Sequence, residues 1–403
     1  MNQPDQLFKL LGVNGRDGEG LSKFAKKSGV SVRKLRYYND NNILPSGTDL
    51  KLLLEASGLA ELELTLGMGR LDSSVIGSIQ KRAKDIAKII GSEEKIEQQN
   101  QRTCSVAFTT TQGKLYRGDC QEILKTMASE SVDLVFADPP FNLKKLYPSN
   151  IDDNLKSERY IHWCQQWIQE CIRVLKHGGS LFLWNLPRWN VALSSFLDGR
   201  LNFRHWISVD IKYSLPIHGR LYPSHYALLY YVKGDKPNVF HPDRLPMQVC
   251  PHCYGDLKDY GGYKDKMNPL GVNLSDIWTD IPPVRHAKYK RRNGANELSL
   301  KLVDRIVEMA SNEGDLIFDP FGGSGTTYMV AELKSRRWLG CEIGPVDAII
   351  DRFKKIDEER EILNSYRARI NALFLEEVKR HRRKLGLWTS ESVRVKRSQT
   401  ELF

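Results

Sequence analysis

The sequence predicts an α/β protein with a mostly parallel sheet, preceded by a small all-α domain. Three observations support this prediction. From Leu115 onward, short apolar runs alternate with amphipathic helical stretches, which is typical of a parallel sheet covered on both faces. Two of the apolar runs, at 132–137 and 316–318, end directly at an aspartate. The region before Leu66, by contrast, contains only short helical patterns and turns.

The first predicted domain, residues 1–67, has a helix-turn-helix pattern. A short helix ends at Gly29, and Ser31 is placed to cap a second helix that carries Arg33, Lys34 and Arg36. With the Pro-Ser pair and apolar helix in 41–56, the stretch resembles lambda-repressor-type helix-turn-helix domains; a MerR-type domain is the competing interpretation. We expect these three basic residues to contact DNA. The alternative is a helical bundle that packs against protein.

Residues 68–113 are predicted to form a helical linker. Apolar residues recur there at a helical period between Val75 and Ile90, and the charged stretch 93–100 follows. A connecting or dimer-forming helix is the expected role.

Strands are predicted beyond this linker at 132–137, 180–184, 206–211, 226–232, 316–319 and 338–341. The clearest helix carries aromatic residues and cysteines on one face from Tyr160 to Leu175, and is expected to stop at His177-Gly178-Gly179. Its period indicates core packing.

Two motifs follow predicted strands and carry chemistry. The run 318–327 is a glycine-rich turn between an apolar strand and a helix, which lets the backbone approach a nucleoside cofactor closely. The sequence Asp138-Pro139-Pro140-Phe141 offers a carboxylate, stiff prolines and a ring, as needed to hold a flipped-out base by its amino group. Glu342 ends another strand, at close to the spacing that presents a carboxylate to ribose hydroxyls.

Together with the segments 115–120 and 131–137, which precede Asp138, these motifs resemble the S-adenosylmethionine-dependent DNA amino-methyltransferases. They occur along the chain in the order that marks the beta group. The resemblance covers roughly 114–351. It implies a Rossmann-like methyltransferase fold with permuted motif order, S-adenosylmethionine as cofactor and duplex DNA as substrate. The implied cofactor residues are Asp119, Asp319, Phe321, Gly323, Gly325, Thr326 and Glu342. The implied catalytic residues are Asp138, Pro139, Pro140 and Phe141.

The resemblance also divides the chain. It places one catalytic half at 114–214, a target-recognition region at 215–295, the cofactor half at 296–355 and a basic helical tail at 356–403. Within the recognition region, the basic stretch with Arg285, Lys288, Lys290 and Arg291 is expected to contact phosphates. The tail is as consistent with a solvated segment as with a DNA-binding arm. The family's usual Lys-Pro pair before the glycine loop is absent at 295–301.

The target base is expected to be adenine, methylated at N6. Cytosine-N4 enzymes of this family more often carry serine at the position of Asp138, and glutamine-modifying enzymes carry asparagine. Cytosine N4, RNA and a glutamine side chain remain alternatives. A DNA-binding regulator on an inactive methyltransferase scaffold is a further alternative, which the intact motifs oppose. A homodimer and a cognate restriction endonuclease are the expected protein partners.

Composition sets the remaining expectations. The net charge of +11 suits a polyanionic partner. No apolar run approaches a membrane span and no secretory signal is seen, so we expect a cytoplasmic protein without a membrane partner. Seven cysteines, mostly in apolar segments, indicate reduced thiols. Cys250 and Cys253 form only half a zinc site. The nearby His241 and His252 could complete a Cys-Cys-His site, but no bound metal is expected.

Overall fold

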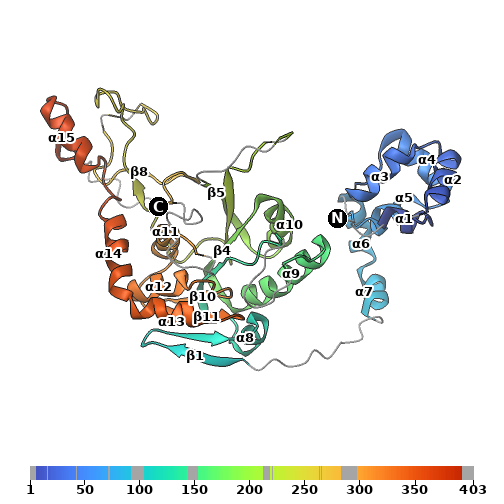
Figure 1. Cartoon of the computed structure of the whole chain (residues 1–403), viewed down its shortest axis with the longest axis horizontal. Helices are drawn as coiled ribbons and strands as arrows, with labels where there is room; N and C mark the ends of the chain where they lie inside the picture. Colours follow the sequence, from blue (N-terminus) through green and yellow to red (C-terminus); the bar gives the residue numbers. More distant parts are fainter. Residues whose placement is uncertain are drawn as a thin grey trace. The chain divides into compact units, whose positions relative to one another are not determined.

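The computed structural model describes residues 6–15, 17–41, 43–70, 73–91, 104–143, 153–211, 218–219, 221–262, 264, 266–282 and 297–392 (Figure 1). The chain divides into two compact units, Met1–Asn100 and Gln101–Phe403. None of the helices in the described ranges is both long and apolar enough to span a membrane.

The first unit is entirely helical in its described part. Its helices are α1 (Gln6–Leu10), α2 (Gly18–Ser28), α3 (Val32–Asp40), α4 (Gly47–Ser57), α5 (Glu61–Gly67), α6 (Ser73–Lys81) and α7 (Ala83–Gly91). Leu21, Leu35, Leu53 and Leu64 are fully buried between α2, α3, α4 and α5. The predicted turn between α2 and α3 is confirmed: Gly29 adopts φ 73° at the end of α2, and the Ser31 hydroxyl accepts the Lys34 N–H at the start of α3.

The second unit contains a nine-stranded sheet in the order β1-β2-β11-β10-β3-β4-β6-β5-β9. The five adjacent strands from β2 to β4 in this order run parallel to one another. Strand β1 pairs with β2, and β6 with β4, in the antiparallel direction. The predicted mostly parallel α/β fold is therefore confirmed. The strands are β1 (Ser105–Thr109), β2 (Gly113–Arg117), β3 (Val132–Ala137), β4 (Leu175–Asn185), β5 (Asn202–Asp210), β6 (His225–Val232), β9 (Ile277–Trp278), β10 (Leu316–Asp319) and β11 (Arg337–Glu342).

Alternating side chains of the strands face two separate cores. On β3, Leu134 and Phe136 enter the core beneath α11 (Leu300–Ala310) and α12 (Thr326–Leu333), whereas Val135 and Ala137 enter the opposite core. That opposite core lies under α8 (Cys120–Thr126), α9 (Ser157–Val174) and α10 (Pro187–Asp198). Figure 1 shows α9 and α10 across the sheet from α12. Both faces are covered, which explains why the central strands are apolar throughout.

Three predicted boundaries were wrong. The sheet begins with β1, inside the segment predicted as a linker. The residues His177-Gly178-Gly179 belong to β4 and do not follow the helix as a loop, because the Gly178 N–H and the Gly179 carbonyl pair with Lys233 beside β6. The predicted recognition region starts too early, since β6 lies within it and is a central strand of the sheet.

The chain departs from the α/β pattern after Val232. Residues 233–282 form an insertion that includes the short edge strand β9. The insertion also carries a two-stranded sheet, β7 (Arg244–Leu245) with β8 (Val272–Asn273). Met247 and Val272 share a small core with Leu373 and Phe374. The remaining helices are α13 (Asp347–Lys354), α14 (Ile356–Arg367), α15 (Glu376–Lys384) and a short 3-10 turn (Ser390–Ser392). The segment predicted as a basic tail is therefore packed in its described part, against both the insertion and the sheet domain.

Candidate active site

Four carboxylates converge at one edge of the sheet. Asp119 follows β2, Glu342 ends β11, Asp319 ends β10 and Asp138 follows β3. These strands are adjacent and parallel, in the order β2-β11-β10-β3. The carboxyl ends of parallel strands meet on the same edge, where open α/β sheets bind their ligands. The structure thus brings together four acidic residues that the sequence spreads over more than half its length.

The glycine loop, Phe321–Thr326, connects β10 to α12 and is tied to two of these carboxylates. The Phe321 N–H donates to Asp319 Oδ1 at 2.9 Å, and the Gly323 N–H donates to Glu342 Oε2 at 2.8 Å. Gly325 adopts φ 73°, and a Cβ atom there would lie 2.7 Å from Ile349 Cγ2. Glycine is therefore required at Gly325 both by backbone conformation and by close packing.

The carboxylates are also electrostatically crowded. Burial raises the pKa of Asp319 well above its ordinary value, and the negative charges of Asp138 and Glu342 raise it further. Burial likewise raises the pKa of Glu342. The Gly344 and Gly323 N–H groups, which donate hydrogen bonds to its carboxylate, lower that pKa by a smaller amount. A site that concentrates negative charge in this way favours a ligand that carries positive charge.

A buried arginine supports the glycine loop from behind, and sequence reasoning missed it. Arg352, on α13, is 1% exposed and donates to the Ser324 carbonyl at 3.2 Å and to Thr326 Oγ1 at 2.7 Å. Its other nitrogen pairs with the buried Glu359 on α14 at 3.0 Å. The Thr326 hydroxyl, predicted to face the cofactor, is thus engaged by Arg352. An arginine in a helix just beyond the recognised motifs gives no sequence signal of this role.

The loop Asp138–Phe141, named the base loop for its predicted role, is held by donors from α9 and α10. Tyr160 Oη donates to the Pro140 carbonyl at 2.7 Å, and Trp189 Nε1 donates to the Phe141 carbonyl at 2.8 Å. Asp153 accepts the N–H groups that follow the loop, from Asn142 at 2.7 Å and Leu143 at 2.9 Å. These hydrogen bonds fix the backbone that presents Asp138, so little ordering remains to be done when a ligand binds.

Phe141 lies in an aromatic cluster. Its ring is 5% exposed and lies 5.9 Å from the ring of Tyr226, which in turn lies 5.0 Å from that of Trp184. Tyr226, at the start of β6, is only half-buried. Sequence reasoning did not single out Tyr226 as a site residue, because its strand pattern explains it without any function.

Helix α9 supports both loops. Tyr160 holds the base loop, and the ring of Phe321 in the glycine loop packs 5.8 Å from Trp163 and 5.0 Å from Trp167. The aromatic face of α9 was predicted to be core, and Tyr160 and Trp167 are indeed buried. Its further effect is to couple the positions of the two loops.

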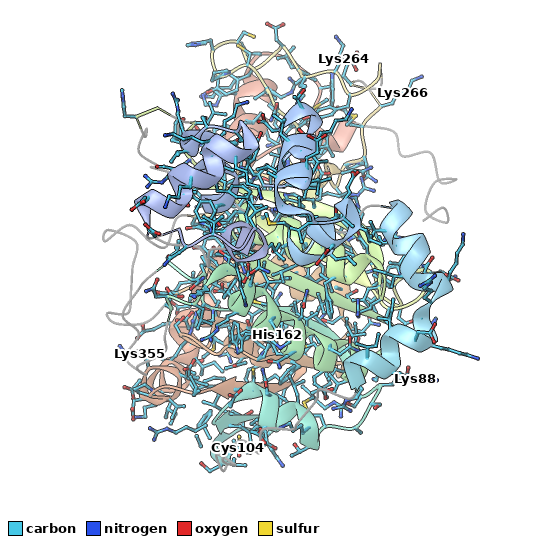
Figure 2. All side chains as sticks on the ribbon, turned by 90° about the vertical axis from the view of Figure 1, so that its right-hand side faces the viewer. Lys88, Cys104, His162, Lys264, Lys266 and Lys355 are labelled. Carbon is cyan, nitrogen blue, oxygen red and sulfur yellow. The ribbon has the colours of Figure 1, made fainter. Side chains whose placement is uncertain are left out.

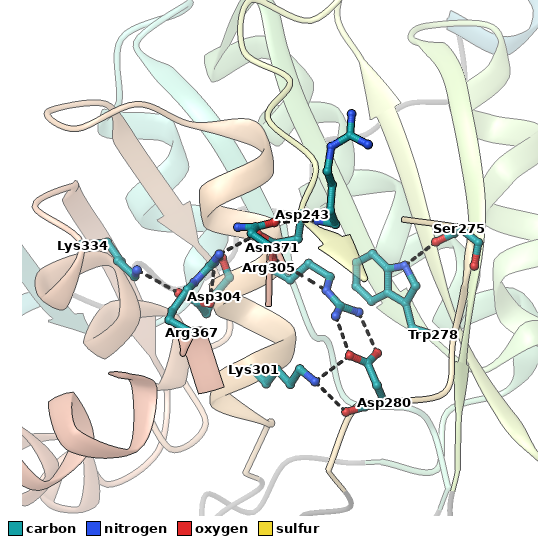
Figure 3. A network of polar contacts seen from close by, with 11 residues as sticks. Asp243, Ser275, Trp278, Asp280, Lys301, Asp304, Arg305, Lys334, Arg367 and Asn371 are labelled. Carbon is teal, nitrogen blue, oxygen red and sulfur yellow. Dashed lines mark hydrogen bonds and ion pairs between the residues drawn. The ribbon is translucent and has the colours of Figure 1, made fainter. Parts of the chain in front are cut away.

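Ion pairs attach the insertion to the sheet domain (Figure 3). Asp280, near the end of the insertion, accepts two hydrogen bonds from Arg305 at 3.0 and 2.7 Å and pairs with Lys301 at 2.6 Å. Burial opposes the charge on Asp280, but Arg305 and Lys301 outweigh it and lower its pKa. Asp243, near the start, pairs with Arg367 of α14 at 2.6 Å. Both ends of the insertion are therefore fixed relative to α11 and α14.

The predicted DNA contacts lie in two places. Arg33, Lys34 and Arg36 are exposed on α3, and Lys34 pairs with Asp49 at 2.9 Å. The others, Arg285, Lys288, Lys290 and Arg291, lie outside the described residues. Within the described part of the insertion, Lys264 and Lys266 are exposed, and Figure 2 shows them near each other.

Comparison with known proteins gives consistent matches. A family model described as DNA methylase matches residues 132–349. The type II methyltransferase M.BamHI of Bacillus amyloliquefaciens is 47% identical over 372 residues, which cover 92% of this chain and 88% of that protein. The DNA adenine methyltransferase YhdJ of Escherichia coli (strain K12) is 32% identical over 57% of this chain and 78% of its own. A solved structure of the cytosine-N4-specific PvuII DNA methyltransferase aligns with a TM-score of 0.45 and 21% identity, covering 64% of this chain and 95% of that one.

Proposed function

The chain belongs to the DNA methylase family, and from this premise we propose that it transfers a methyl group from S-adenosylmethionine to the exocyclic amino group of a base within a specific sequence of duplex DNA. One observation carries the proposal. The base loop and the glycine loop follow the neighbouring parallel strands β3 and β10, so a base held by one loop lies beside a cofactor held by the other.

The residues of the base loop suit an amino group that is a poor nucleophile. Its lone pair is delocalised into the ring of the base. When the Asp138 carboxylate and the Pro139 carbonyl accept the two amino hydrogens, the nitrogen becomes more pyramidal and its lone pair turns towards the methyl donor. This interaction strengthens in the transition state and therefore accelerates the reaction. As the bond from nitrogen to methyl formed, the methyl–sulfur bond of the donor would break and S-adenosylhomocysteine would leave. The excess proton would pass from the methylated nitrogen to Asp138 or to water.

The opposite side of the site suits S-adenosylmethionine. The cofactor supplies an electrophilic methyl group on a positively charged sulfur, and the crowded carboxylates favour that charge. Glu342 is assigned to the ribose hydroxyls, Asp119 to the adenine amino group, and Phe321, with Gly323 and Gly325, to the adenosine and methionine. The position of the glycine loop, between the end of β10 and the start of α12, supports the backbone part of this assignment.

We propose adenine N6 as the acceptor, on the aspartate at Asp138 and the likeness to YhdJ, which is named as an adenine methyltransferase. Cytosine N4 is the second candidate, because cytosine presents an amino group beside a ring nitrogen in the same arrangement. In this proposal the base loop contacts mainly the amino group, which both bases carry. Residues beside the loop would therefore contribute to the choice of base together with Asp138, and Phe141 and Tyr226 are the candidate stacking residues.

Mass spectrometry of nucleosides tests the proposal directly. The full chain is expressed in a host without DNA methylation, the DNA is hydrolysed, and N6-methyladenine and N4-methylcytosine are quantified, with Asp138→Ala as the matched control. We expect N6-methyladenine in wild type alone. N4-methylcytosine in its place would overturn the choice of base and keep the reaction. DNA without either product, from a folded protein, would overturn the reaction itself.

We also propose a cognate type II restriction endonuclease as functional partner, because M.BamHI is named as a type II methyltransferase. Sequencing the modified DNA gives the methylated context. DNA carrying that modification should resist an endonuclease that cleaves the same sequence, and cleavage at the unmodified rate would contradict the partnership.

A further inference from the structure

A short loop in the insertion, residues 250–256, is closed on itself and lies outside the proposed active site. The Cys250 N–H donates to the Asp256 carbonyl at 2.9 Å, and the Tyr254 N–H donates to the Cys250 carbonyl at 3.0 Å. A bridge between Val249 and Leu257 joins the residues on either side. The backbone thereby brings both ends of the loop together.

Three metal-ligating groups meet at this closure. The sulfurs of Cys250 and Cys253 and a carboxylate oxygen of Asp256 lie within 4.8 Å of one another. Cys253 Sγ is 3.4 Å from Asp256 Oδ2. Two thiolates with one carboxylate suit Zn²⁺, whereas Ca²⁺ and Mg²⁺ require oxygen ligands throughout. Sequence reasoning considered His241 and His252 as further ligands and did not include Asp256, which becomes a neighbour only through the fold of the loop.

A backbone N–H group points at one of the two sulfurs. The Asp256 N–H donates to Cys253 Sγ at 3.4 Å. Within the loop, the Cys253 thiol donates to Asp256 Oδ2 at 3.4 Å. A metal ion would take the place of that proton, because the thiolate is the form of cysteine that binds metal.

We propose that Cys250, Cys253 and Asp256 bind one Zn²⁺ ion, with a water molecule in the fourth tetrahedral position. Two Zn–S bonds and one Zn–O bond to Asp256 replace bonds to hydration water, one water ligand is kept, and each thiol releases its proton to solvent. Zinc affinity therefore falls as the pH is lowered. The site is separate from the proposed methyl-transfer site, since none of the groups assigned to methyl transfer belongs to it.

The zinc ion would stiffen a loop on which α15 rests. The Tyr254 carbonyl accepts a hydrogen bond from Arg382, and the Tyr254 ring stacks on His381 at a centroid distance of 4.4 Å. Among the described residues around the loop, the apolar core is small: it consists of Met247, Val272, Leu373 and Phe374, and Leu257 packs against it. A metal ion adds a cross-link where apolar burial is slight.

Metal analysis of the full chain tests the proposal. The protein is expressed with added zinc, desalted, and its metal content is measured by mass spectrometry. We expect one zinc ion per chain in wild type and none in Cys250→Ser/Cys253→Ser, whose exposed or half-buried serines preserve the fold. Asp256→Asn should weaken zinc binding, in a competition with a coloured chelator, by at least the roughly 10- to 100-fold that loss of an outer-shell partner costs.

Asp259→Asn is the matched control for Asp256→Asn. Asp259 belongs to the same insertion, but its carboxylate accepts the Gly262 N–H and is not among the three donors. It should retain zinc at wild-type affinity. Cobalt substitution gives a second readout, because thiolate ligands produce a charge-transfer band that is lost in the double serine variant. Wild-type protein without zinc, or equal zinc in the double serine variant, would overturn the proposal.

Discussion

The base loop and the glycine loop follow neighbouring strands, but they are held by different forces. Neutral donors hold the base loop itself, with Tyr160 and Trp189 each donating to one backbone carbonyl, and the buried Asp153 holds only the residues that follow it. Buried charge holds the glycine loop, through Arg352 on one side and Glu342 on the other. A neutral hydrogen bond contributes about 0.5 to 1.5 kcal/mol, whereas stranding one buried charge costs about 3 to 5 kcal/mol.

This difference means that the two loops should fail differently. The base loop is held by several hydrogen bonds of small energy, so its backbone should keep its conformation when one of them is removed. Its proposed role in methyl transfer depends mainly on Asp138. The glycine loop depends on a few large contributions, so a single change behind it should threaten the fold. The expected effects therefore decrease from the support of the glycine loop, through the two ligand sites, to the exposed helix α3.

The largest effect is expected from Arg352→Ala. This change removes the Arg352 partner of the buried Glu359 and the donors to Ser324 and Thr326. The unfolding free energy of the second unit should therefore fall by about 3 to 5 kcal/mol. Tryptophan fluorescence during urea unfolding measures it, because all eight tryptophans lie in the second unit.

Arg360→Ala is the matched control for this measurement. Arg360 lies on α14 and pairs with Asp357, but both side chains are more than half exposed. Its loss should cost about 0 to 1 kcal/mol. Equal effects of the two substitutions would contradict the distinction between charged support of the glycine loop and ordinary surface pairing.

Asp138→Ala should reduce methyl transfer by about 100- to 1,000-fold, comparable to the loss of one preorganised group at a developing charge. Stability and cofactor affinity should stay near those of wild type, because the hydrogen bonds from Tyr160 and Trp189 to the loop remain. A radiolabelled transfer assay and calorimetric titration with cofactor separate the two properties. Residual activity above a few per cent of wild type would contradict the assignment of Asp138 to the amino group of the base.

Glu342→Ala should weaken cofactor binding more than the transfer step, and it should also lower stability, because the Gly323 and Gly344 N–H groups lose their acceptor. Cofactor affinity should weaken by about 1.5 to 3 kcal/mol, the range for hydrogen bonds to a charged group, and the cofactor KM should rise. Calorimetric titration measures the loss. An unchanged affinity for S-adenosylmethionine would show that the ribose is held elsewhere.

The pH dependence sharpens this third prediction. Burial raises the pKa of Glu342 above its ordinary 4.5, so its contribution to stability is present below that value and is lost as pH rises through the folded pKa. Cofactor affinity should change in the opposite direction, falling as pH drops through the folded pKa, because the ribose hydroxyls need the ionised acceptor. In Glu342→Gln, this pH dependence of affinity should disappear; its persistence would assign it to another group.

The smallest effect is expected from a change outside both loops. Arg33→Ala/Arg36→Ala should weaken DNA binding and make its salt dependence shallower, by roughly one unit of slope for each phosphate that is no longer neutralised. Lys26→Ala/Lys27→Ala, exposed on α2, removes the same charge and serves as control. Cofactor affinity and the stability of the second unit should not change. Equal slopes for the two double variants would argue against a specific DNA contact through α3.

Much of the fold follows from local sequence pattern. The ends of β3 and β10 were predicted correctly, and those of β6 and β11 to within one residue, because buried strands between turns have a strong local signature. The strands β1 and β2 were not predicted, since β1 lies at the sheet edge and its side chains are mostly exposed or half-buried. The end of α9 was misplaced because Gly178 and Gly179 join a strand through partners at Lys233, far along the chain.

The sequence by itself determined the α/β class and the motifs at Asp138 and Phe321–Gly325, because each depends on residues that are close in the chain. Only the tertiary structure decided what surrounds them. Strand order brought Asp119, Glu342, Asp319 and Asp138 to one edge of the sheet, and packing placed Arg352 behind the glycine loop. The physical reason is that local pattern fixes backbone conformation, whereas pairing between distant segments depends on how the whole chain buries its apolar faces.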